Sequence, residues 1–151
     1  MRLNRSRALA CALLAACAAT FGVGAARVGA QGGAAEFVSA AELKERLSKG
    51  EPVTLIDLRS ADTYAGSDGK IAGALHIKER RLRARLALPP LRDLARDAEV
   101  VTYCACPNDE AAVRAAQTLS AAGFKRVRVL KGGWRGWLDA RGQVEAKPRG
   151  Q

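Results

Sequence analysis

A cysteine follows a short run of residues that is typical of a buried strand. Val100–Tyr103 is β-branched and aromatic, and Cys104 comes directly after it. A short loop separates Cys104 from Glu110–Ala122, an alanine-rich run that predicts a helix. A strand, a loop and a helix in this order direct backbone N–H groups and the positive end of the helix dipole at the loop. Because this environment lowers the pKa of a thiol, and the thiolate is the nucleophilic form, we predict that Cys104 is a nucleophile.

A second cysteine, Cys106, lies two residues after Cys104. In one interpretation it is a resolving thiol that forms a disulfide with Cys104 or attacks a persulfide on it. Such a disulfide closes a small ring and is expected to be easily reduced. In the other interpretation Cys106 only fills the loop. Outside the N-terminal segment, His76 is the one further candidate for a soft metal ligand, so we predict no metal site and, without a phosphate loop or haem motif, no cofactor.

The first 30 residues have the pattern of a secretory signal peptide. A basic start precedes the uncharged, apolar stretch 8–26, and Val28–Ala30 suits cleavage before Gln31. We therefore expect the protein to be periplasmic or secreted. Two alternatives stay open: Leu14–Cys17 resembles a lipoprotein box, which would attach a lipid to Cys17, and an uncleaved segment would leave the chain attached to the membrane.

Basic residues outnumber acidic residues in this sequence. Removing residues 1–30 takes away four arginines and no acid, which leaves 21 basic and 15 acidic residues and a net charge of +6. Such an excess attracts small anions. We expect no nucleic-acid partner, because the basic residues are scattered and few aromatic residues lie among them. The basic segment Lys78–Asp97 is interpreted as short helices with a solvated face, interrupted by Pro89-Pro90.

The remaining elements predict one α/β domain over residues 37–142. Short apolar runs at Val53–Leu58 and Val127–Leu130 are read as strands, and they alternate with predicted helices. This alternation favours a parallel sheet with helices on both faces. Residues 31–36 are expected to form a flexible leader, and residues 143–151 a disordered tail. Two charged residues, Asp57 and Arg59, lie at the carboxyl end of the first strand, where sites form in such sheets.

Four segments together resemble one known family, the rhodanese-like (thiosulfate sulfurtransferase-like) domains. They are the acid and arginine of Asp57–Arg59, the G-x-I-x-G-A-x-x-I pattern of Gly69–Ile77, the strand and nucleophile of Val101–Cys104, and the G-F…L-x-G-G-x-x-x-W ending of Gly123–Trp137. The resemblance implies a five-stranded parallel sheet and a persulfide on Cys104 as the intermediate.

The resemblance also implies roles and substrates. The active-site loop would comprise Ala105, Cys106, Pro107, Asn108 and Asp109, and the pair Asp57 and Arg59 would support it. The sulfur donor would be thiosulfate, a persulfide or a polysulfide, and the acceptor a thiol or cyanide. Two rival functions remain: a non-catalytic binding module, and a thiol–disulfide redox protein that uses both cysteines.

One loop position departs from the family pattern. Members that act on thiosulfate usually carry an arginine five residues after the nucleophile, and Asp109 stands there instead. A carboxylate facing the loop is expected to repel an anionic donor and to raise the pKa of the thiol. Arg114, further along the predicted helix, is a candidate substitute for the missing arginine, although a solvent-facing role is equally expected.

Overall fold

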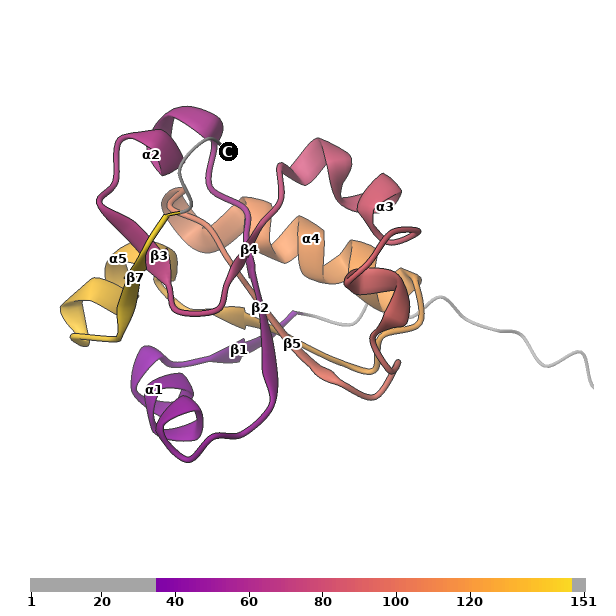
Figure 1. Ribbon diagram of the computed structural model, residues 1–151, viewed down its shortest axis with the longest axis horizontal. Coiled ribbons are helices and arrows are strands. Elements are labelled where there is room, and N and C mark those ends of the chain that lie inside the picture. The colour runs from indigo at the N-terminus through magenta and orange to yellow at the C-terminus, as the bar shows by residue number, and fades with distance from the viewer. Residues whose placement is uncertain (1–34, 148–151) are drawn as a thin grey trace, which may run out of the picture.

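The centre of the molecule is a five-stranded parallel sheet with the order β1–β6–β5–β2–β4 (Figure 1). The computed structural model describes residues 35–147. All five residues of the central strand β5 are buried, as expected for a strand covered on both faces. The predicted five-stranded parallel sheet is confirmed. Its strands are β1 (Glu36–Val38), β2 (Val53–Asp57), β4 (Leu75–His76), β5 (Glu99–Tyr103) and β6 (Arg126–Leu130).

Helices cover both faces of this sheet, as predicted. The core on one face includes side chains of α3 and α4, such as Leu82 and Leu119, and the opposite core includes Leu43 of α1 and Trp137 of α5. Adjacent residues of β5 point to opposite cores, Val100 toward the first and Val101 toward the second. The helices are α1 (Ala40–Ser48), α2 (Ala61–Ala65), α3 (Leu82–Arg85), α4 (Glu110–Ala121) and α5 (Gly133–Asp139), with 3-10 turns η1 (Glu79–Arg81), η2 (Leu91–Asp93) and η3 (Pro107–Asp109).

The strands end together at one edge of the sheet. In the pairing register, Asp57 lies opposite both Tyr103 and His76, so β2, β4 and β5 stop at the same level. The segments that follow them, which begin at Leu58, Ile77 and Cys104, therefore leave the sheet side by side. This edge positions the candidate site.

The C-terminal prediction was wrong in part. Residues 143–147 were expected to belong to a disordered tail, but β7 (Val144–Ala146) pairs antiparallel with β3 (Gly69–Ile71). The ring of Trp137 holds the approach to β7: its Nε1 donates to the carbonyl of Gln143 at 3.1 Å. The pairing uses backbone groups, so a polar sequence gave no sign of it.

The N-terminal boundary also differs slightly. Glu36, expected in the flexible leader, is the first residue of β1, which pairs with β6. The predicted signal peptide, the rest of the leader up to residue 34, and residues 148–151 lie outside the described part of the chain. Within residues 35–147, no helix is both long enough and apolar enough to span a membrane.

Candidate active site

Cys104 lies at the floor of a cavity of about 1130 Å³ at the carboxyl edge of the sheet. The residue itself is only 1% exposed. Ala105 and Cys106 continue along the cavity wall, and α4 supplies another side of it. The predicted nucleophile is therefore not enclosed by the hydrophobic core alone, because its loop opens onto a space that a ligand can enter.

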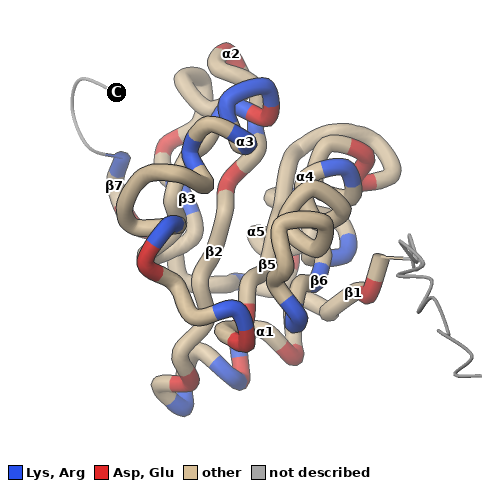
Figure 2. The backbone as a smooth tube through the Cα atoms, turned by 90° about the vertical axis from the view of Figure 1, so that its right-hand side faces the viewer, with Lys and Arg blue, Asp and Glu red and all other residues tan. Residues whose placement is uncertain are grey.

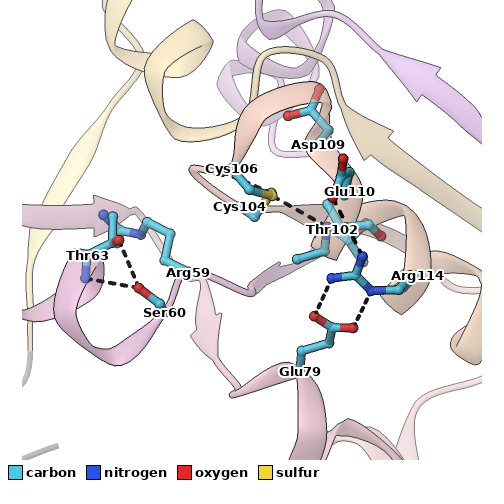
Figure 3. Close-up of a disulfide and its surroundings, with 12 residues drawn as sticks. Arg59, Ser60, Thr63, Glu79, Thr102, Cys104, Cys106, Asp109, Glu110 and Arg114 are labelled. Atoms are coloured by element: carbon cyan, nitrogen blue, oxygen red, sulfur yellow. Dashed lines mark hydrogen bonds and ion pairs between the residues drawn. A yellow bond between two sulfur atoms is a disulfide. The ribbon is translucent and has the colours of Figure 1, made fainter.

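The two cysteines of the loop are joined by a disulfide (Figure 3). The backbone N–H of Cys106 is directed at Sγ of Cys104 at 3.4 Å, and the N–H of Ala111 is directed at Sγ of Cys106 at 3.4 Å. Ala111 lies in the first turn of α4, so the positive end of this helix lies next to the sulfur of Cys106. Each sulfur thus has one N–H donor that favours its anionic form when the disulfide is reduced.

The expectation for Asp109 was wrong. Asn108 and Asp109 have φ values of 57° and 55°, in the left-handed region, which turns the end of the loop. As a result the carboxylate of Asp109 points away from the two cysteines, as Figure 3 shows, and the residue is only 7% exposed. Its Oδ2 accepts a hydrogen bond from the N–H of Gly132 at 2.8 Å. Asp109 joins the loop to the segment before α5 and does not line the cavity.

Two glycines allow that segment to approach the loop closely. A Cβ on Gly133 would lie 2.1 Å from the carbonyl oxygen of Cys104, and Gly133 also has a positive φ of 49°. The next residue, Trp134, donates its N–H to the same carbonyl at 2.8 Å. The turn at Gly132-Gly133 therefore fixes the backbone of Cys104.

Asp57 and Arg59 form a fully buried ion pair beside the loop. Arg59 Nη2 lies 2.6 Å from Oδ2 of Asp57, and Tyr103 donates its hydroxyl to the same oxygen at 2.8 Å. Arg59 also donates to the carbonyl of Gly69 at 3.0 Å, and its guanidinium lies 4.2 Å from the centre of the Trp134 ring. These contacts tie β2 to β3 and to the residue that precedes Cys104, which is the arrangement a supporting pair requires.

The environment of Tyr103 keeps its phenol protonated. Burial, followed by the negative charge of Asp57, raises the pKa of Tyr103 well above its ordinary value. The phenol therefore remains a hydrogen-bond donor to Asp57 throughout the physiological pH range. His76 stacks on Tyr64, with ring centres 3.7 Å apart, and its Nε2 lies 3.1 Å from the carbonyl of Arg59. His76 itself is not among the residues that line the cavity.

The opposite wall of the cavity is basic. The segment Lys78–Arg85, around η1 and α3, carries many of the basic residues, which Figure 2 shows in blue. The side chains of Lys78, Arg80 and Arg83 are exposed, as the expected solvated face requires, and they also line the cavity. Their position just after β4, a strand that ends at the site, is the signal in the sequence that could have predicted this placement.

Arg114 of α4 also lines the cavity, so the proposed substitute for a loop arginine lies where it can contact a ligand. Its guanidinium is held by Glu79, with Nε and Nη2 donating to the two carboxylate oxygens at 2.6 and 2.9 Å. The hydrogen bonds from Arg114 lower the pKa of Glu79. Arg114 is therefore partly neutralised at neutral pH. No cluster of three or more His, Cys, Asp or Glu suited to a metal ion occurs among residues 35–147.

The chain belongs to the rhodanese-like domain family, whose model matches residues 39–140. The crystal structure of the Alr3790 protein from Anabaena sp. is 34% identical, with a TM-score of 0.61, over 73% of this chain and 82% of that one. The human single-domain sulfurtransferase TSTD1 is 28% identical, with a TM-score of 0.58, over 70% of this chain and 96% of that one.

A third structure, the BH2092 protein from Bacillus halodurans, is 27% identical, with a TM-score of 0.62, over 74% of this chain and 77% of that one. Among curated protein sequences, none matches this chain. Domains of this family are in general sulfurtransferases that act on sulfur donors and acceptors. The predicted family and fold are confirmed.

Proposed function

We propose that this protein is an exported sulfurtransferase that moves sulfane sulfur through a persulfide on Cys104. The single observation that carries the proposal is the place of this residue: it follows the central strand, at the floor of a cavity with a basic wall, and its Sγ accepts an N–H hydrogen bond. A thiol in this position can be held as a thiolate and reached by a donor once the disulfide is reduced.

The reaction divides into two displacements at sulfur. The Cys104 thiolate attacks the outer sulfur of the donor, and the bond between the two donor sulfurs breaks. Its electron pair leaves with sulfite when the donor is thiosulfate, or with a thiolate when the donor is an organic persulfide. An acceptor thiolate or cyanide then attacks the outer sulfur of the Cys104 persulfide and restores the thiolate. Covalent catalysis replaces one difficult transfer by two easier ones.

The lining of the cavity suits an anionic donor. Lys78, Arg80 and Arg83 contribute positive charge, and Glu79 offsets that of Arg114. Positive walls around a cleft raise the local concentration of anions. The volume of about 1130 Å³ reaches the upper end of the range for pockets that bind organic molecules, so an organic persulfide fits as well as thiosulfate.

The test of the proposal is sulfur transfer by the reduced protein. Thiosulfate and glutathione persulfide serve as donors and cyanide as the acceptor, and thiocyanate is measured. The wild type is expected to form thiocyanate catalytically with at least one donor, and Cys104→Ser to form none above the uncatalysed rate while unfolding at a similar urea concentration. A wild type that transfers no sulfur from either donor contradicts the proposal and favours a non-catalytic binding module.

Export is a separate part of the proposal, and it rests on the pattern of residues 1–30. Expressed with its native N-terminus in a bacterium with two membranes, the protein is expected in the periplasmic fraction, with Gln31 as its first residue. A membrane-bound form whose attachment is lost in Cys17→Ala would instead support lipid attachment at Cys17. Retention of the full chain in the cytoplasm would contradict export.

A further inference from the structure

We propose that Cys106 resolves the persulfide on Cys104, so that the transferred sulfur leaves as sulfide and a Cys104–Cys106 disulfide remains. The protein would then act as a sulfane-sulfur reductase in addition to a transferase. This inference rests on the proposed function, because a persulfide must form on Cys104 first. The observation that carries it is the pairing of the two sulfurs across a single loop turn.

The geometry needs no rearrangement of the loop. The Cα atoms of Cys104 and Cys106 lie 5.7 Å apart, a usual separation for a disulfide. Because the loop already brings the two Sγ atoms to bonding distance, Cys106 reaches the inner sulfur of a Cys104 persulfide, which is Sγ of Cys104 itself. The outer sulfur lies one bond further away. The placement of Cys106 therefore favours attack on the inner sulfur.

The N-terminus of α4 equips Cys106 to attack. The N–H of Ala111 is directed at Sγ of Cys106, at the positive end of a helix of 12 residues. Amide donors and a helix dipole stabilise a thiolate, and the thiolate is the form that attacks a disulfide or persulfide sulfur. A cysteine that merely filled the loop would not need its sulfur at the start of this helix.

The resolution step is a displacement at the sulfur of Cys104. The Cys106 thiolate attacks Sγ of Cys104, a sulfur–sulfur bond forms between the two cysteines, and the bond to the outer sulfur breaks. The outer sulfur leaves with the electron pair of that bond and takes up a proton as hydrosulfide. Two cysteine sulfurs are oxidised to a disulfide, and one sulfane sulfur is reduced to sulfide.

An external dithiol must then reduce the disulfide for a second turnover. Cys106 is the more exposed of the two sulfur-bearing residues, and Cys104 is 1% exposed. Attack by the dithiol on Sγ of Cys106 releases Cys104 as a thiolate, onto which the N–H of Cys106 is directed. The reductant thus regenerates the Cys104 thiolate directly, and the mixed disulfide forms between the reductant and Cys106.

The experiment is a single turnover without oxygen or reductant. The fully reduced wild type, Cys106→Ser and Cys104→Ser are each mixed with thiosulfate or glutathione persulfide whose outer sulfur carries a heavy isotope. Labelled sulfide is trapped and counted, and the mass of the intact protein is measured. Urea unfolding shows whether each variant is folded, and Cys106→Ala provides a second variant if Cys106→Ser does not fold.

With a donor that loads Cys104, the wild type is expected to release labelled sulfide equal in amount to the protein and to lose the mass of two hydrogens. Cys106→Ser is expected to gain one labelled sulfur and release at least tenfold less sulfide. A wild type that keeps the labelled sulfur, or a Cys106→Ser that releases as much sulfide as the wild type, overturns this inference and leaves the transferase proposal intact. If neither protein gains a sulfur or releases label with either donor, the transferase proposal fails as well.

Discussion

Asp109 shows how much one side chain depends on distant backbone. Its carboxylate accepts the N–H of Gly132, which lies 23 residues further along the chain. Two successive residues with positive φ, Asn108 and Asp109, turn it in that direction. With an aspartate in place of the family's arginine, the loop loses a cation, but the carboxylate is not among the groups that line the cavity.

This contact predicts a specific cost of mutation. Asp109→Ala removes the half-buried hydrogen bond from Gly132, whose acceptor is charged, and is expected to destabilise the protein by about 1–3 kcal/mol in urea unfolding. Asp109→Asn keeps an acceptor oxygen and a residue that tolerates the left-handed region, so it is expected to retain most of the stability. Equal unfolding midpoints for Asp109→Ala and the wild type would show that this hydrogen bond contributes nothing.

The sequence was sufficient to place Cys104 at the end of a buried strand, but not to predict the direction of Asp109. Cys104 could be found because a local pattern, a buried run followed by an alanine-rich helix, surrounds it. The orientation of Asp109 has no local signal, because it depends on the φ values of the loop and on a glycine from another element. The disulfide had a local signal in the spacing of Cys104 and Cys106, but that spacing alone also fitted a free thiol.

At the scale of elements, the site depends on how closely α5 approaches the end of β5. Gly133 permits this approach, and Trp134 donates its N–H to the carbonyl of Cys104. Next to Trp134, the pair of Asp57 and Arg59 holds β2 against Tyr103. The backbone around Cys104 is thus fixed through both backbone and buried polar contacts.

Gly133→Ala tests the first of these contacts. The added Cβ would collide with the carbonyl of Cys104 and strain a positive φ. Gly73→Ala is the matched control, because Gly73 has a positive φ of 76° and open space around its Cβ position. The control is expected to lose about 1–2 kcal/mol from backbone strain alone. Gly133→Ala is expected to lose more and to slow thiocyanate formation, so equal losses and rates in the two variants would contradict this role.

Arg59→Met tests the second contact. It leaves the carboxylate of Asp57 buried without its cation, and removal of one partner from a buried pair costs about 3–5 kcal/mol. The double variant Asp57→Asn with Arg59→Met removes the uncompensated charge and is expected to be more stable than Arg59→Met alone. Urea unfolding measures both, and a double variant at least as unstable as Arg59→Met would show that charge burial is not the cause.

Some helices and strands could be predicted from the sequence and others could not. The strands and helices around the site follow apolar runs and caps, and Ser39 caps α1 by accepting the N–H of Glu42. β1 and β7 were missed because each has three residues and is held by pairing with a partner strand rather than by its own pattern. Short edge strands of this kind carry too little periodicity to be recognised.

At the scale of the whole molecule, part of the positive charge lies at the edge where the strands end. The turn η1 and helix α3 bring Lys78, Arg80 and Arg83 to the cavity, across from α4. The sequence showed the excess of positive charge and its attraction for anions, but the wall it forms depends on how η1 and α3 lie against α4. Glu79 offsets part of this positive charge, because it forms an ion pair with Arg114.

This balance predicts how donor binding responds to charge and pH. Glu79→Gln frees Arg114 and is expected to lower KM for an anionic donor, whereas Arg114→Gln is expected to raise it. Because Arg114 lowers the pKa of Glu79 below its ordinary 4.5, the pair persists at neutral pH and breaks only as the pH falls through the lowered value. The stability that the exposed pair adds is lost over the same acidic range, and it is small.

Steady-state kinetics at several salt concentrations check this prediction. Added salt is expected to raise KM for thiosulfate in the wild type, since it screens the attraction of the basic wall. A KM that is unaffected by Glu79→Gln, by Arg114→Gln and by salt would show that the basic wall does not contact the donor.

The location of the transferred sulfur shows whether Cys104 is the residue that forms the persulfide. Cys106→Ser protein is reduced, exposed briefly to thiosulfate or glutathione persulfide, alkylated and digested, and the peptide that contains Cys104 is analysed by mass spectrometry. We expect an alkylated persulfide on Cys104, and no added sulfur anywhere in Cys104→Ser. A persulfide on another residue, or none on Cys104 with either donor, would contradict it.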